Sequence, residues 1–220
     1  MRYDWGMDIL VAGGHGQIAL RLLKLLAAEG HTARGLIRDP AQGADLQAVG
    51  GVPVIGNLET EESLSPYVKG ADAVVFAAGA GPGSGAERKR TVDLGGAIKL
   101  ADAAVDQGVR RYVMVSSIGA QDPAGASGPM VPYLEAKAEA DAYVQNTGLD
   151  WTVVRPGGLT DDPGTGLVTA TRTLGNRGRI PRDDVAAVLA ACLTTASADT
   201  IGVTFELFAG DTPIAEALRF

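Results

Sequence analysis

The stretch "DILVAGGHGQIALRLLKLLAAEG", residues 8–30, constrains the fold more than any other part of the chain. It begins as an apolar run of strand length and ends in an apolar pattern with the period of a helix. Gly13, Gly14 and Gly16 lie between the two. Glycine costs conformational entropy on folding, so either this turn is merely tight or a ligand must approach its backbone.

Apolar runs of strand length alternate with helical patterns along the rest of the chain. Strands are expected at "DILVA", "TARGLI", "VPVIG", "DAVVFAA", "RYVMVSS", "WTVVRP" and "VTFELF". Helices are expected near residues 16–29, 40–49, 61–68, 86–107, 132–147, 182–196 and 213–219. Because the strands are almost unbroken apolar runs, they predict a parallel sheet covered on both faces. The fold class is therefore α/β, a doubly wound parallel sheet in three α/β/α layers, with strand order 3-2-1-4-5-6 and a last strand added.

The chain is expected to form one domain, residues 1–220. Two glycine-rich segments interrupt the alternation: "AAGAGPGSGAE" after the fourth strand and "PGGLTDDPGTG" after the sixth. Both follow the carboxyl ends of strands, where open α/β sheets bind ligands. We expect loops near residues 79–90 and 157–180 to form a small substrate region.

Composition excludes several classes of protein. With 220 residues, 46% hydrophobic and 20% charged, the chain suits a soluble globular domain. A net charge of −7 without any basic run argues against nucleic-acid binding. No apolar stretch reaches the ~20 residues that span a bilayer, and the start lacks the apolar core of a signal peptide. A single cysteine, Cys192, fits a reducing cytoplasm, and two histidines with one cysteine form no metal-ligand set.

The opening turn has the spacing of a dinucleotide-binding turn, with Gly13, Gly16 and Ala19 in G-x-x-G-x-x-A order. The first glycine permits a sharp exit from the strand, the second lets a pyrophosphate approach, and the small alanine lets the helix pack closely. N–H groups of the first helical turn would face the phosphates. We favour this interpretation over a merely tight turn. For His15 itself, a solvent-facing loop position is favoured over a contact to a phosphate or ribose. The candidate cofactor contacts here are Gly13, Gly14, His15, Gly16, Gln17 and Ile18.

The end of the second strand, "LIRDP", bears on which cofactor binds. A ribose 2′-hydroxyl is usually met by a carboxylate near this point, and a 2′-phosphate by an arginine. Arg38 comes first here, so we expect NADP(H) with Arg38 as the phosphate contact. The alternative is a surface pair of Arg38 with Asp39, which would contribute little energy. Asp39 is also expected to cap the helix that starts at Pro40.

The segment "VPYLEAKAEADAYVQ" holds the candidate catalytic pair, Tyr133 and Lys137. Their i, i+4 spacing places both side chains on one helix face. An ammonium near a phenol stabilises the phenolate, which suits the pair to exchange a proton with a substrate carbonyl or alcohol. The preceding strand ends in Ser116 and Ser117, of which only one should face the cleft because side chains alternate along a strand. Ser117 is favoured narrowly to orient the substrate oxygen. The alternative is an ordinary helix with an exposed lysine.

Taken together, these motifs resemble those of the short-chain dehydrogenase/reductase superfamily, and more narrowly its atypical NmrA-like or epimerase-like branch. The resemblance covers nearly the whole chain. It is carried in order by "LVAGGHGQIA", "LIRDP", "VVFAAGAG", "TVDLGGAIKLADAA", "RYVMVSSIGA", "YLEAK", "GLDWTVVRPGGLTDDPGTG" and "IPRDDVAAVLAACL". It implies a Rossmann fold that binds NADP(H), and a serine–tyrosine–lysine group in members that catalyse a reaction.

The resemblance also assigns further cofactor contacts. Asn57 and Leu58 would flank the adenine, and Lys137 would bind the nicotinamide ribose. The remaining assigned contacts are Ala77, Ala78 and Gly79 at the ribose, and Arg155, Pro156 and Gly157 at the nicotinamide.

Four departures from the family pattern bear on these expectations. Asp93 stands where the superfamily's active-site helix commonly has an asparagine, which leaves the proton relay open. Asn57 replaces a usual aspartate and should hold the adenine amino group less firmly, whereas Ala19 is a tolerated change. The region beyond "PGTG" is short, so a small carbonyl compound is favoured over a nucleotide-sugar.

Three functions therefore remain open. The leading one is an NADP(H)-dependent oxidoreductase acting on a small carbonyl or alcohol substrate. The others are a non-catalytic NADP(H)-binding sensor and a sugar epimerase or dehydratase. The expected partner is a small molecule, without nucleic acid or membrane, and the protein is expected to be a monomer or homodimer.

Overall fold

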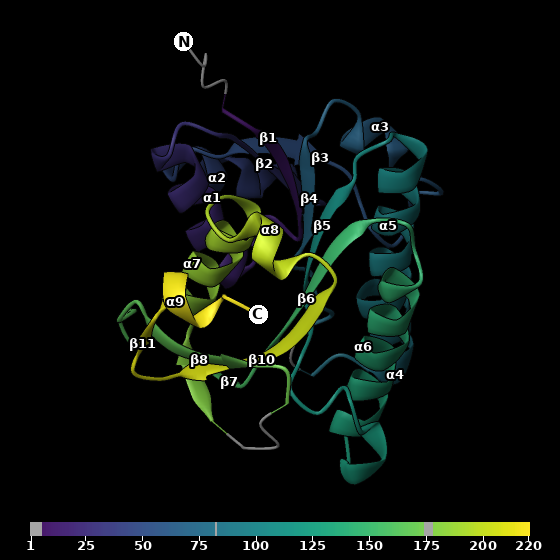
Figure 1. Ribbon diagram of the computed structural model, residues 1–220. Coiled ribbons are helices and arrows are strands. Elements are labelled where there is room, and N and C mark those ends of the chain that lie inside the picture. The colour runs from purple at the N-terminus through teal and green to yellow at the C-terminus, as the bar shows by residue number, and fades with distance from the viewer. Residues whose placement is uncertain (1–5, 82, 174–177) are drawn as a thin grey trace.

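The computed structural model describes residues 6–81, 83–173 and 178–220. A nine-stranded sheet runs through the middle of the molecule, with helices on both faces (Figure 1). The fold is thus the three-layer α/β/α Rossmann type that the alternating pattern predicts.

The order of the strands in the sheet is β11-β8-β10-β6-β5-β4-β1-β2-β3. From β3 to β10 all neighbouring strands are parallel. This confirms the predicted order 3-2-1-4-5-6, and β10 is the added last strand. The strands are β1 (Asp8–Ala12), β2 (Thr32–Ile37), β3 (Val52–Ile55), β4 (Ala73–Phe76), β5 (Arg111–Val115), β6 (Asp150–Pro156), β7 (Gly158–Thr160), β8 (Leu167–Thr171), β9 (Arg179–Pro181), β10 (Val203–Ala209) and β11 (Thr212–Pro213).

The helices largely follow the predicted pattern, although the one expected over residues 61–68 is limited to a single turn. They are α1 (Gln17–Ala28), η1 (Pro40–Gln42), α2 (Gly43–Ala48), α3 (Ser65–Val68), α4 (Ala86–Arg88), the π-helix η2 (Lys89–Gly95), α5 (Gly96–Asp106), η3 (Pro123–Gly125), α6 (Met130–Gln145), α7 (Arg182–Leu193), α8 (Ser197–Thr200) and α9 (Ile214–Ala217). None of the described helices is both long and apolar enough to cross a membrane.

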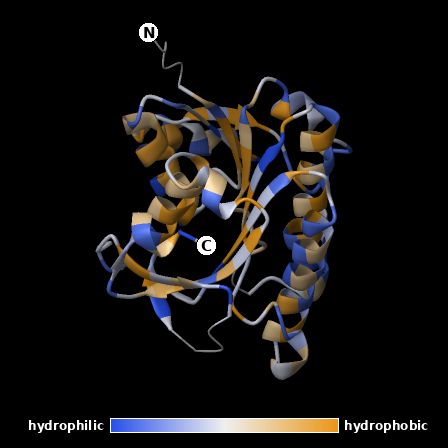
Figure 2. Cartoon of the chain, in the orientation of Figure 1, coloured by the Kyte–Doolittle hydropathy of each residue, from blue (hydrophilic) through white to orange (hydrophobic). Residues whose placement is uncertain are grey.

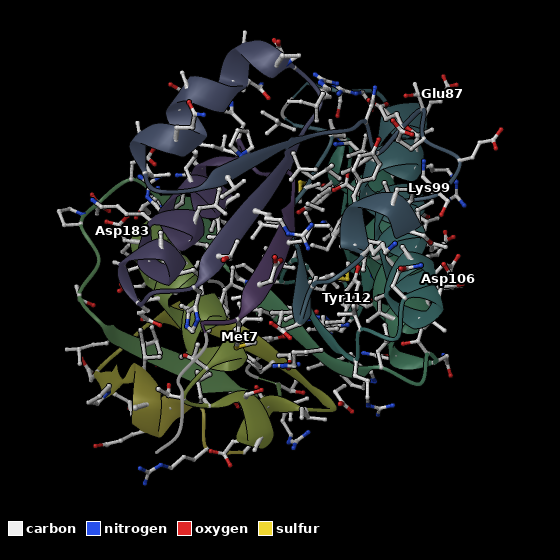
Figure 3. The ribbon with its side chains drawn as sticks, turned by 90° about the horizontal axis from the view of Figure 1, so that it is seen from above. Met7, Glu87, Lys99, Asp106, Tyr112 and Asp183 are labelled. Carbon is white, nitrogen blue, oxygen red and sulfur yellow. The ribbon has the colours of Figure 1, made fainter. Side chains whose placement is uncertain are left out.

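Alternation along the strands produces two apolar cores, one on each side of the sheet. In β1, Ile9 and Val11 pack with α1 and α7, whereas Leu10 and Ala12 pack with α5 and α6. The hydrophobic colour accordingly predominates on the central strands, whereas the helices carry both hydrophobic and hydrophilic colours (Figure 2). Seen from above, Tyr112 of β5 lies on the α5 side of the sheet, where its hydroxyl donates to the carbonyl of Ala97 (Figure 3). A sheet buried on both faces requires the almost unbroken apolar strands of this sequence.

Two expectations need correction. Residues 157–180, expected as a loop, contain β7, β8 and β9, and β8 runs antiparallel to β10. These short strands are held by pairing with distant segments, which local apolar patterning does not reveal. The helix expected over residues 86–107 is three successive pieces, α4, η2 and α5, because seven residues wind as a π-helix.

The buried Arg111 of β5 forms hydrogen bonds that connect α7 and α8 to the sheet. Arg111 of β5 is 7% exposed and donates to the carbonyl of Cys192 at 2.7 Å. It also donates to the hydroxyls of Thr152 at 2.8 Å and Thr200 at 3.1 Å. Burial lowers the pKa of Arg111. Arg111 thus satisfies a carbonyl at the end of α7, where helices leave acceptors without partners.

Candidate functional site

The three glycines of the first turn differ in what they require. Gly13 has φ +82°, and a Cβ added there would lie 2.7 Å from the Cα of Ala78. A Cβ on Gly14 would lie 2.7 Å from the Cα of Gly35 in β2. Close packing therefore explains these two glycines. Gly16 is exposed, and its added Cβ would meet only the Gly13 carbonyl oxygen closely, at 3.1 Å. Packing explains it least, so Gly16 is the position where room for a ligand matters.

The N-terminus of α1 has the features of an anion site. Its N-cap is Gly16, which has no side chain to cap the first N–H groups, and the first turn holds no acidic residue. N–H groups at such an end, with the helix dipole, attract negative charge. Gln17 and Ile18 of this turn line a pocket that is described below.

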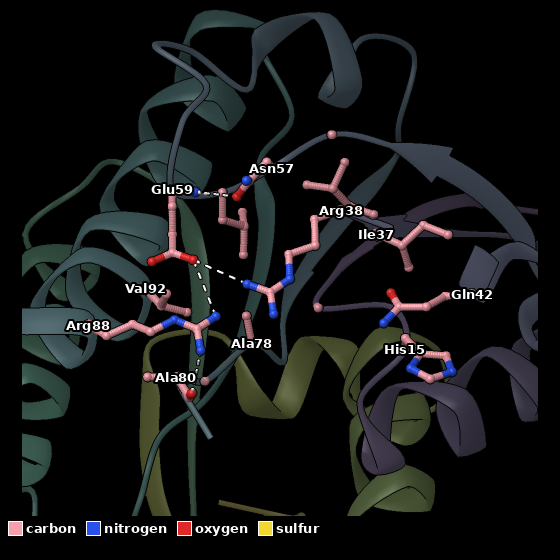
Figure 4. A pocket seen from close by; sticks show the side chains of 15 residues that line it. His15, Ile37, Arg38, Gln42, Asn57, Glu59, Ala78, Ala80, Arg88 and Val92 are labelled. Carbon is pink, nitrogen blue, oxygen red and sulfur yellow. Dashed lines mark hydrogen bonds and ion pairs between the residues drawn. The ribbon is translucent and has the colours of Figure 1, made fainter. Parts of the chain in front are cut away.

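Beside this turn lies the arginine pocket, which Arg38, Asn57, Glu59, Gly79 and Arg88 line among others (Figure 4). Arg38 Nη1 lies 3.4 Å from Glu59 Oε2, and Arg88 Nη2 lies 3.3 Å from the same oxygen. Arg88 Nη1 also donates to the carbonyl of Ala80 at 3.3 Å. Two guanidinium groups thus converge on one carboxylate, which leaves an excess of positive charge.

The residues around this pocket confirm the predicted helix cap at Asp39 and show the contacts of two other candidate residues, Asn57 and His15. The Asp39 carboxylate accepts a hydrogen bond from the Ala41 N–H at 2.9 Å, so Asp39 caps η1 as predicted. Asn57 turns its side-chain oxygen to the Glu59 N–H at 2.9 Å. His15 lines the pocket, and its Nε2 lies 2.8 Å from an Asp45 carboxylate oxygen.

A second cavity, the tyrosine pocket, adjoins the arginine pocket at Ala78, Gly79 and Ala80. It has a volume of about 540 Å³, and Tyr133 and Lys137 both line it. This volume is within the range of sites that hold small molecules. The i, i+4 spacing on α6 thus brings the candidate catalytic pair to one cavity.

Lys137 is buried and ion-paired. Its side chain is 3% exposed, and Nζ lies 3.3 Å from Oδ1 of Asp93, which is fully buried in η2. That contact lacks hydrogen-bond geometry, and Nζ instead donates to the Val115 carbonyl at 3.1 Å. The other Asp93 oxygen accepts from the Ala80 N–H at 3.0 Å. Lys137 Nζ also lies 5.9 Å from the centroid of the Tyr133 ring.

The two serines at the end of β5 have different surroundings. Ser116 is 4% exposed, and its hydroxyl donates to Asp141 at 2.9 Å. Burial raises the pKa of the Asp141 carboxyl, while the nearby Arg155 guanidinium, 2.9 Å away, acts in the opposite direction. Ser117 is more exposed and donates to the carbonyl of Ile118. Both residues line the tyrosine pocket. The Ser116 hydroxyl is bound to the buried Asp141 carboxylate, whereas the Ser117 hydroxyl is not.

The structure gathers most of the residues that the sequence singled out. The arginine pocket takes Gly13, His15, Arg38, Asn57, Leu58, Ala78 and Gly79. The tyrosine pocket takes Gln17, Ile18, Ala77, Ala78, Gly79, Asp93, Ser116, Ser117, Tyr133, Lys137, Pro156 and Gly157. Gly14 packs against β2, and Gly16 lies at the surface.

Several lining residues escaped sequence reasoning. Glu59, Arg88, Lys89 and Arg182 all belong to the two pockets. Arg88 and Lys89 lie in "GAERKR", where the expected loop near residues 79–90 overlaps the start of the helix expected near residues 86–107. The available signal was the position of these neighbouring cations directly after a glycine-rich loop that follows a strand.

These features fit a pyridine dinucleotide. The α1 N-terminus and exposed Gly16 suit a pyrophosphate, and the arginine pocket suits a phosphorylated ribose. Within the described residues, no group of three or more His, Cys, Asp or Glu side chains is placed to hold a metal ion.

Comparisons with known proteins agree with this geometry. A family model described as NAD(P)H-binding matches residues 13–196. The uncharacterized sugar epimerase YhfK of Bacillus subtilis is 40% identical over 215 residues, which cover 97% of this chain and 99% of YhfK.

Two solved structures extend the comparison. A protein of Bacillus halodurans, provisionally named an NAD-dependent epimerase/dehydratase, has a TM-score of 0.91 at 41% identity, with 97% of this chain and 99% of that one covered. The oxidoreductase ylbE of Lactococcus lactis has a TM-score of 0.82 at 28% identity, with 96% and 95% covered. The chain therefore belongs to the NAD(P)H-binding, oxidoreductase- and epimerase-like family of Rossmann-fold proteins.

Proposed function

We propose that the protein is an NADP(H)-dependent oxidoreductase that reduces a small carbonyl compound or oxidises the corresponding alcohol. One observation carries the proposal: Tyr133, Lys137 and Ser117 line a single pocket that joins the arginine pocket. The name of the Lactococcus lactis structure, an oxidoreductase, points the same way.

The preference for NADP(H) rests on Arg38 and Arg88. The two guanidinium groups share one carboxylate, Glu59, so a 2′-phosphate would add the negative charge that balances them. Loss of a charge-assisted hydrogen bond costs roughly 1.5–3 kcal/mol. Arg38→Ala should therefore weaken NADPH binding about 10–100-fold and leave NADH binding nearly unchanged. Equal losses for both cofactors in calorimetry would contradict this role.

In the proposed reaction the cofactor supplies or accepts hydride, and the chain provides position and a proton. Tyr133 donates its phenolic proton to the substrate oxygen, and Ser117 donates a hydrogen bond to the same oxygen. Lys137, held by the Val115 carbonyl and Asp93, stabilises the phenolate that results and would bind the nicotinamide ribose. Asp93 fixes the ammonium and the Ala80 backbone in place.

The test is Tyr133→Phe, which removes the proton donor and keeps the ring. General acid catalysis contributes about 10²–10⁴-fold to such rates. NADPH oxidation across a carbonyl panel should fall by that order, while the NADPH dissociation constant stays near that of the wild type. Unchanged turnover in Tyr133→Phe would refute the assignment.

A second candidate function is favoured by the ion pair of Lys137 with Asp93, because a neutralised ammonium stabilises a phenolate less. The chain would then bind the cofactor without net consumption, either as a sensor or as a sugar epimerase or dehydratase. The names of its Bacillus relatives, a sugar epimerase and an epimerase/dehydratase, agree with the second of these. Nicotinamide absorbance that is retained through purification and not consumed by any carbonyl would favour this candidate.

A further inference from the structure

Three consecutive cations stand where α4 passes into η2, and they point in three directions. Arg88 reaches Glu59 in the arginine pocket, at 3.3 Å. Arg90 lies on the outer face and makes hydrogen bonds of 3.0 and 3.1 Å to Glu139 of α6. Lys89, between them, lines the tyrosine pocket. Two of the three cations therefore pair with carboxylates, and the third, Lys89, faces the cavity.

Lys89 lies close to the candidate proton donor. Its Nζ is 5.2 Å from the centroid of the Tyr133 ring, nearer than the 5.9 Å of Lys137. A cation over an aromatic face is stabilised by the ring, which helps to keep a half-buried ammonium in place without a carboxylate. Lys89 is also the first residue of the π-helix η2, a distortion that is frequent at functional sites.

Among the described residues that line the tyrosine pocket, every cation except Lys89 has a carboxylate partner. Lys137 is paired with Asp93 at 3.3 Å, and Arg182 with Asp161 at 2.8 Å. Within the described part of the chain, Lys89 has an aromatic neighbour and no carboxylate partner. A partly desolvated ammonium attracts an anion much more strongly than one in bulk water. The pocket therefore favours a ligand that brings a negative charge to Lys89.

We propose that Lys89 binds an anionic group of the substrate, so that the preferred substrates are carbonyl compounds that carry a carboxylate. This inference rests on the proposed reductase function and names its substrate class. Because Lys89 lies over the ring of Tyr133, anchoring the carboxylate there holds the carbonyl of the same molecule in the cavity that the phenol lines. Lys89 then acts as a specificity residue rather than as a proton donor.

The experiment compares two compounds that differ in one charge, 4-formylbenzoate and its methyl ester. Calorimetry on the NADP⁺-loaded full chain measures their binding, and NADPH absorbance measures their reduction. The wild type should bind 4-formylbenzoate about 10–100-fold more tightly than the ester, the equivalent of one charge-assisted hydrogen bond. Lys89→Met should abolish this preference and leave ester binding within about 2-fold. Arg90→Met, which removes the same charge from the next residue, should keep the preference.

Four results would overturn the proposal: no binding of 4-formylbenzoate, equal binding of both compounds by the wild type, a preference that survives Lys89→Met, or an equally large loss of NADP⁺ affinity in that variant. The last would assign Lys89 to the cofactor. Failure of the reductase function looks different. If neither compound is reduced but carboxylate binding depends on Lys89, the anion site stands and the reductase proposal falls. If wild type and Lys89→Met reduce the two compounds equally well, the reductase proposal stands and the anion site at Lys89 falls.

Discussion

Replacing the second and third glycines of the first turn with alanine should separate packing from ligand binding. In Gly14→Ala the new Cβ would lie 2.7 Å from the Gly35 Cα and 2.8 Å from its carbonyl carbon, both backbone atoms of β2. Neither can move without disturbing the sheet. Overpacking of this kind costs about 1–3 kcal/mol. For a domain of this size 1 kcal/mol shifts Tm by roughly 2–4 °C, so a cost near 2 kcal/mol lowers Tm by about 4–8 °C.

Gly16→Ala should behave in the opposite way. Gly16 has φ −65° and ψ 150°, which alanine adopts freely, and the nearest atom to its added Cβ would be the Gly13 oxygen, at 3.1 Å. The Tm of the free protein should change by no more than about 2 °C. The added methyl group would hold a pyrophosphate away from the α1 N–H groups, at a cost of roughly 1.5–3 kcal/mol. NADPH affinity should then fall about 10–100-fold.

Differential scanning calorimetry of the free proteins and titration calorimetry with NADPH measure the two effects. Full NADPH affinity in Gly16→Ala would refute the idea that this glycine leaves room for a phosphate. A wild-type Tm in Gly14→Ala would refute the packing argument.

Three further predictions concern the core. Arg111→Met should lower the free energy of unfolding in urea by about 2–3 kcal/mol, because the Cys192 carbonyl loses its donor in a buried place. The neighbouring surface variant Arg110→Met, which breaks an exposed pair with Asp150, should cost at most about 1 kcal/mol; equal costs would contradict the buried role. Burial raises the pKa of Cys192 to about 11, so iodoacetamide at pH 8.5 should alkylate the native protein far more slowly than the urea-unfolded chain, and equal rates would refute this. Since the folded state keeps that proton, stability should fall as pH rises from about 9 to about 11, by about 1.4 kcal/mol per unit, a component that Cys192→Ala should lack.

The fold was predictable because its signal is local and repeated. Strands β1, β2, β4, β5 and β6 are apolar runs that are largely buried. The edge strand β3 is also apolar, although it is partly exposed. The local apolar pattern therefore predicts the strands of the sheet. The turn at Gly13 and the cap at Asp39 were equally readable, since each depends on residues within a few positions. By contrast, β8 and β9 are held by distant partners, and strands as short as these leave no distinct apolar pattern.

The site divides in the same way. Spacing alone put Tyr133 and Lys137 on one helix face, and strand ends put Ser116 and Ser117 near them. The pairing of Lys137 with Asp93, 44 residues apart in sequence, exists only because η2 and α6 pack together. The sharing of Glu59 by Arg38 and Arg88 likewise needs three separate segments to meet. Sequence determines which groups are present and which face of an element each one occupies. Only the tertiary structure decides which charges neutralise one another, because electrostatic energy depends on distance in space and on burial rather than on separation along the chain.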